Sequence, residues 1–89
     1  MKISKVINPN PNEEEYIYWC AGCKHSHAIW VREQHPCWTF DGNFERPTIK
    51  PSVKIEGVCH HIITDGMIAY QADCSHELDG QTIEMSEID

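Results

Sequence analysis

The chain has no long apolar run. No segment approaches the about 20 consecutive apolar residues that a membrane-spanning helix needs, and residues 1–9 lack the extended apolar stretch of a signal peptide. These absences predict a protein that has no membrane segment and works in the cytoplasm.

Basic residues are also scarce. Seven Lys and Arg stand against 14 Asp and Glu, which gives a formal net charge of −7. Such a surface repels phosphate backbones on average, and the chain has no cluster of Lys or Arg to offset this. The composition therefore argues against nucleic acid as a partner, and a protein partner fits the charge better.

The chain is too short to build a large core. A domain of 89 residues buries only about 60 to 65% of the surface that its unfolded chain exposes, so small domains often add a disulfide, a metal or an oligomeric contact. Five Cys are present, and in a reducing compartment an odd number favours metal thiolates over disulfides. We expect an N-terminal extension or loop over residues 1–12 and a single zinc-stabilised domain over residues 13–89.

Aromatic and β-branched segments alternate with turn signals along the chain. The predicted fold class is mainly β, a small antiparallel β-hairpin domain with a zinc knuckle and at most one short helical turn, over residues 75–80. Residues 46–52 contain two prolines and are expected to form an edge or loop segment rather than a central strand. The expected hairpins join residues 16–20 to 27–31, 38–40 to 44–45, and 53–63 to 67–72, with a last strand over 81–85.

A cysteine pair lies between the first two expected strands. The sequence Cys20-Ala21-Gly22-Cys23 has the spacing of a zinc knuckle, in which a Gly permits a tight turn and two thiolates face one ion. A knuckle supplies only two of the four ligands of tetrahedral zinc. The other two must come from elsewhere in the chain.

The hairpin around Asp65-Gly66 offers two further thiols. If Thr64 pairs with Met67, the two-residue alternation of strands brings Cys59 and Cys74 to one face as diagonal neighbours. The predicted Zn²⁺ ligands are therefore Cys20, Cys23, Cys59 and Cys74.

Several alternatives to this set stay open. His27, His60 or His76 can replace one cysteine in a mixed site. The thiols can also be small buried hydrophobes with no metal, while a disulfide between Cys59 and Cys74 is disfavoured by the compartment. Cys37 has no partner at a ligand spacing and is expected in the core.

The same register places His60 and Asp73 on the opposite face of the hairpin. Together with His76 they can form a pocket of imidazole and carboxylate groups that supports the zinc ligands or performs acid and base catalysis. His60, Asp73 and His76 are therefore the candidate catalytic residues, although support of the metal is the commoner role. Candidate anion contacts, which can equally be hydrogen-bonding groups of turns and strands, are Arg46, Thr48 and Ser52.

With these motifs placed, the chain resembles a family of short phage and prophage proteins of unknown function that are often labelled ammonia monooxygenase. The resemblance implies a viral or prophage gene, acting in the host cytoplasm, and supports reading the Cys and His positions as one unit. It implies no proven activity, and an oxygenase of that kind needs membrane spans that this chain lacks. The residues that carry the resemblance are Cys20-Ala21-Gly22-Cys23, His27, residues 38–43, Arg46-Pro47-Thr48, Pro51-Ser52, Cys59-His60, Asp65-Gly66, residues 73–76 and residues 80–82.

The motifs support two functional hypotheses. The first is a non-enzymatic, zinc-stabilised module that binds a protein, such as a component of a host system that it antagonises. The second is a small-ligand-binding protein or metal-dependent hydrolase that uses the His60 and Asp73 pocket. The sequence reveals no reaction, and the first hypothesis is the one we expect.

Overall fold

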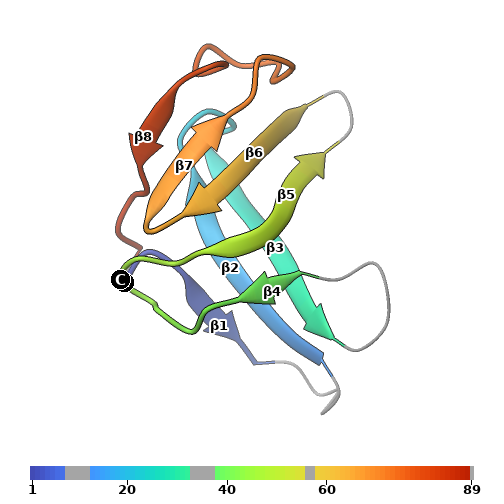
Figure 1. The fold of residues 1–89 in the computed structure, drawn as a ribbon, viewed down its shortest axis with the longest axis vertical. Coiled ribbons are helices and arrows are strands. Elements are labelled where there is room, and N and C mark those ends of the chain that lie inside the picture. The colour runs from blue at the N-terminus through green and yellow to red at the C-terminus, as the bar shows by residue number, and fades with distance from the viewer. Residues whose placement is uncertain (8–12, 33–37, 56–57, 89) are drawn as a thin grey trace.

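The fold consists of two antiparallel β-sheets, shown in Figure 1. The computed structural model describes residues 1–7, 13–32, 38–55 and 58–88. The first sheet has the order β1-β2-β3 and the second the order β4-β5-β6-β7-β8, so the predicted mainly β fold class is confirmed. No helix long and apolar enough to cross a membrane occurs in these four segments. The strands are β1 (Ser4–Val6), β2 (Glu13–Cys20), β3 (His25–Arg32), β4 (Thr39–Phe40), β5 (Ile49–Ile55), β6 (Cys59–Thr64), β7 (Met67–Tyr70) and β8 (Thr82–Glu84).

The first sheet follows from strict alternation along β2. Tyr16, Tyr18 and Cys20 are buried while Trp19 is exposed, as expected when one face of a strand covers a core. The predicted pairing across the cysteine turn is confirmed, with Cys20 opposite His25. Strand β1 pairs with the other edge of β2, so the segment expected to be an N-terminal extension contains one strand of this sheet.

The expected hairpin over residues 38–45 does not form. Strand β4 pairs instead with β5, with Phe40 opposite Ile49. The reason lies in two short polar side chains that bind backbone amides locally and so hold the segment as a loop. Asp41 Oδ1 accepts hydrogen bonds from the amides of Asn43 and Thr48, and Asn43 Oδ1 accepts from the two amides that follow Phe44.

Strand β5 lies between β4 and β6 and contains a bulge. Residues 46–52 were expected to form only an edge or loop segment, and this is wrong for residues 49–52, which belong to β5. Ile49 pairs with Ile63 and Val53 pairs with His61, and the register shifts between these two pairs. A bulge bends the strand and re-aims its side chains. Ser52 is the last residue of this bulge.

The third expected hairpin is confirmed in its register. Thr64 lies opposite Met67 and His61 opposite Tyr70, and Asp65 and Gly66 form the turn with φ angles of 49° and 78°. The strand expected over residues 53–63 is interrupted, because the amide of Val58 donates to the carbonyl of Ile55 and closes a turn between β5 and β6.

The segment after β7 contains turns in place of the expected helical turn. The amide of Asp79 donates to the carbonyl of His76, and that of Gln81 to the carbonyl of Leu78. The chain then enters β8, which corresponds to the expected last strand. This series of turns carries several of the residues that matter for the site.

The core lies between the two sheets (Figure 1). In and next to the first sheet, Ile3, Tyr18 and Ile29 are fully buried. In the second sheet, Ile63 and Ile68 are each only 1% exposed. Burial of such side chains stabilises a fold by about 1.5 to 3 kcal/mol each. The cysteines at one end of this core lead to the functional site.

Candidate metal centre and adjacent polar triad

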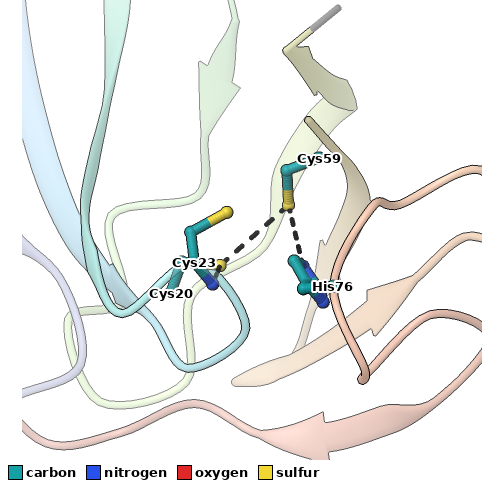
Figure 2. Close-up of side chains that lie close together, drawn as sticks. All are labelled: Cys20, Cys23, Cys59 and His76. Carbon is teal, nitrogen blue, oxygen red and sulfur yellow. Dashed lines mark hydrogen bonds between the residues drawn. The ribbon is translucent and has the colours of Figure 1, made fainter. Parts of the chain in front are cut away.

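Four potential metal ligands from three segments of the chain meet at one end of the core. The ligand atoms of Cys20, Cys23, Cys59 and His76 all lie within 4.8 Å of one another, and Figure 2 shows these side chains gathered in one place. The Sγ atoms of Cys20 and Cys59 are 4.0 Å apart, and Cys59 Sγ is 3.4 Å from His76 Nε2. Three thiols and one imidazole form a donor set of the kind that binds a metal ion such as zinc.

Gly22 makes room for the fourth of these ligands. A Cβ atom at this position would overlap the imidazole ring of His76. The turn itself relies on Lys24, which has a φ angle of 60° and whose amide donates to the carbonyl of Cys20 at 2.8 Å. The Gly of the knuckle is thus required by the approach of His76 and not by the turn.

Hydrogen-bond donors surround the Cys20 and Cys59 sulfurs. The amide of Cys23 and the hydroxyl of Tyr70 lie 3.3 Å and 3.2 Å from Cys20 Sγ. His61 Nδ1 lies 3.1 Å from Cys59 Sγ, while its Nε2 is 2.6 Å from the hydroxyl of Tyr18. Donors of this kind stabilise thiolates and orient them toward a metal.

His61 is held as a neutral imidazole. It is fully buried, and burial followed by repulsion from neighbouring imidazoles lowers its pKa to about 3. Burial raises the pKa of Tyr18, so its hydroxyl keeps its proton, and in one of the two neutral tautomers of His61 it donates that proton to Nε2. The single proton of His61 then resides on Nδ1 and points at the Cys59 sulfur.

The thiols differ in how readily they ionise. Burial opposes ionisation of Cys20, but hydrogen bonds from surrounding side chains and the Cys23 amide outweigh it, so its pKa is lowered to about 5. Burial, followed by the adjacent Cys20 thiolate, raises the pKa of Cys59, and the same two causes raise that of Cys23. A cation among the three sulfurs removes this repulsion and allows all of them to ionise. The cluster therefore fits a metal ion both in geometry and in charge.

Three other predicted ligands, Cys74, His27 and His60, lie outside this group, and His60 contacts Asp73 and Ser52 instead. The Cys74 thiol contacts the backbone of His60, and His76 occupies the fourth position of the cluster in its place. His27 is buried beside His61, with stacked rings 5.5 Å apart, and its Nε2 has no partner among the described residues. Cys37 lies outside the described residues, and the other four cysteines are free thiols.

A second constellation lies directly beside the metal cluster. Ser52 Oγ is 3.2 Å from His60 Nε2, and His60 Nδ1 is 3.1 Å and 3.2 Å from the two carboxylate oxygens of Asp73. The His60 side chain is 26% exposed and that of Asp73 is 54% exposed. The hairpin register predicted the contact of His60 with Asp73. It did not predict Ser52, which approaches from the bulge of β5.

The remaining polar candidates serve the turn between β6 and β7. Arg46 makes two hydrogen bonds to the carboxylate of Asp65, at 2.9 Å and 3.1 Å. The Thr48 hydroxyl accepts the amide of Asp65 at 2.8 Å. Of the three candidate anion contacts, two are thus engaged in a turn and only Ser52 meets His60.

A serine that is hydrogen-bonded to an imidazole, which in turn is held by a carboxylate, is the arrangement of serine hydrolases. The chain belongs to the BubE family, described as bacterial ubiquitination-like system serine protease (BubE), whose model matches residues 2–71. This range includes Ser52 and His60 and stops just before Asp73. No curated protein and no solved structure matches the chain.

The family assignment corrects the functional expectation. A non-enzymatic protein-binding module is wrong, because the family is described as a serine protease. The alternative of a small-ligand-binding protein or metal-dependent hydrolase does not describe this family either. The phage or prophage origin implied by the resemblance is not tested by the match and stays a prediction.

Proposed function

We propose that this chain is a serine protease of a ubiquitination-like system, in which Ser52 is the nucleophile, His60 the general base and Asp73 the orienting carboxylate. The observation that carries the proposal is the chain of contacts from Ser52 Oγ through the two ring nitrogens of His60 to Asp73. The family description supports it independently. The substrate is accordingly a protein that contains the amide bond to be cleaved.

In this proposal each proton of the reaction has a carrier. His60 Nε2 takes the proton of Ser52 as Oγ attacks the carbonyl carbon, and it returns this proton to the departing amine. Water then hydrolyses the acyl-enzyme by the same steps and frees Ser52. Asp73 accepts a hydrogen bond from Nδ1–H of His60, which keeps Nε2 unprotonated and directed at Ser52.

The metal centre has a structural part in this proposal. We assign Zn²⁺ to Cys20, Cys23, Cys59 and His76, because four protein ligands complete a tetrahedral set and leave no position for substrate. Cys59 directly precedes His60, and His76 follows Asp73 within one short turn. A bound ion would therefore hold the two segments that carry the base and the carboxylate against the first sheet.

Covalent labelling tests the proposal without knowledge of the natural substrate. A fluorophosphonate probe reacts with an activated serine: the serine oxygen bonds to phosphorus, fluoride leaves and the base takes the proton. We expect one labelled site per chain, at Ser52, and loss of labelling in Ser52→Ala. Ser26→Ala is the matched control, because Ser26 is exposed on β3. Labelling that persists in Ser52→Ala, or that is absent from the folded wild-type protein, would refute the assignment.

A further inference from the structure

Cys74 is the one predicted cysteine ligand that lies outside the cluster, and its thiol makes contacts of a different kind. Its Sγ atom lies 3.2 Å from the amide of His60 and 3.0 Å from the carbonyl of the same residue. The thiol therefore accepts one hydrogen bond and donates one, and both go to the backbone of the proposed general base. Cys74 is 8% exposed, so these bonds are shielded from water.

The strand pairing explains why a side chain is needed here. β7 ends at Tyr70, and beyond it the amide of Gln71 still donates to the carbonyl of His60 at 2.8 Å. The carbonyl of Gln71 accepts from the amides of Cys74 and Gly80 instead. The His60 amide therefore donates its hydrogen bond to the Cys74 sulfur and not to the Gln71 carbonyl, which regular strand pairing would supply.

The same turn delivers the orienting carboxylate. The amide of Cys74 bonds to the carbonyl of Gln71 at 3.2 Å, which closes a turn of four residues with Asp73 in its third position. Asp73 then reaches back to the His60 ring. The Cys74 thiol thus ties one end of the turn to the backbone of His60. His60 is also the residue whose ring the Asp73 carboxylate contacts.

We propose that Cys74 is a positioning residue of the triad, which ties the turn that bears Asp73 to the backbone of His60. This inference rests on the proposed function. It assigns the thiol a different task from the metal ligands, because a thiolate bound to a metal has no proton to donate to the His60 carbonyl. Without the thiol, the turn is free to shift relative to His60, and displacement of about 1 Å in an active site can cost about 100-fold in rate.

Three variants separate positioning from metal binding. Cys74→Ala removes both hydrogen bonds, while Cys74→Ser keeps a group that can donate and accept. Ser75→Ala is the matched control, because it removes a neighbouring hydrogen bond, from Ser75 Oγ to the carbonyl of Val58, that does not involve His60. If Cys74→Ala does not fold, Cys74→Val fills the space without a polar group. Each variant is compared with wild type in metal content, thermal unfolding and fluorophosphonate labelling rate.

We expect Cys74→Ala to keep its metal and to label about 100-fold more slowly. Cys74→Ser and Ser75→Ala should label at close to the wild-type rate, because the serine hydroxyl of Cys74→Ser can form both hydrogen bonds and Ser75 does not contact His60. Proton NMR gives a readout that does not require catalysis. The Nδ1–H resonance of His60, shifted downfield by Asp73, should be present in wild type and Cys74→Ser and be lost or broadened in Cys74→Ala.

The outcomes distinguish the two proposals. If wild type does not label but its downfield resonance disappears in Cys74→Ala, the protease assignment fails and positioning of His60 stands. An unchanged resonance and labelling rate in Cys74→Ala would overturn the positioning role. Equal loss of metal in Cys74→Ala and Cys74→Ser would overturn it as well, by identifying the thiol as a ligand.

Discussion

Metal binding to the thiol cluster should release two protons per ion near neutral pH. The pKa of Cys20 is lowered to about 5, so this thiol is already a thiolate before the metal arrives. The pKa values of Cys23 and Cys59 are raised, first by burial and then by interaction with Cys20, so both thiols still carry their protons. Metal binding must therefore displace the protons of Cys23 and Cys59, whereas Cys20 has no thiol proton left to lose.

The sign and size of the pH dependence follow from this count. Protons compete with the metal for the thiols, so metal affinity rises with pH. Each displaced proton contributes a factor of ten per pH unit, which predicts an increase of about 100-fold per unit around pH 7.4. Three ordinary thiols, with pKa values of about 8.5, would instead release nearly three protons and give almost 1,000-fold.

Calorimetry measures the proton count directly. Zn²⁺ is titrated into reduced, metal-free protein at about pH 7.4, in buffers with different ionisation enthalpies, and the dependence of the observed heat on the buffer gives the number of protons. Competition with a chelator at several pH values checks the slope. Ser52→Ala is a suitable control, because it alters the triad and leaves the cluster unchanged. A count near three would refute a preformed cluster with an ionised Cys20, and a count near zero would refute thiolate ligation.

Three further predictions concern the same region. Gly22→Ala should weaken metal binding in a chelator competition, because the added methyl group overlaps the His76 ring, and unchanged affinity would contradict the placement of that ring. Tyr18→Phe leaves His61 Nε2 without its donor in a buried site, so urea denaturation should show a loss of about 1 to 3 kcal/mol, and a loss below this range would mean that the bond is not formed. Asp73→Asn should slow fluorophosphonate labelling by about 10³-fold to 10⁴-fold with metal content and stability retained, and wild-type labelling would exclude the carboxylate from the triad.

The mainly β fold class and the hairpin around Asp65-Gly66 could be predicted from local patterns. Strand alternation and turn residues act over a few positions, so they are readable without tertiary contacts. The same register placed His60 and Asp73 side by side, and the spacing of Cys20 and Cys23 indicated two of the four groups that meet in the cluster. These inferences hold because each depends on a single hairpin or turn.

Which of the candidate residues meet in the site depends on contacts between segments that are distant in the sequence. Ser52 reaches His60 from a bulge in β5. Pro51 within the shift is compatible with a bulge, but it does not set the register or the partner of Ser52. The position of His76 in the cluster depends on the turns after β7 and on the absence of a side chain at Gly22. The Cys74 thiol contacts the backbone of His60 and so lies outside the ligand cluster. Alternation along a strand predicts which face of the sheet a side chain occupies. Only the packing of the two sheets and their loops decides which of several cysteine, histidine and serine side chains come into contact.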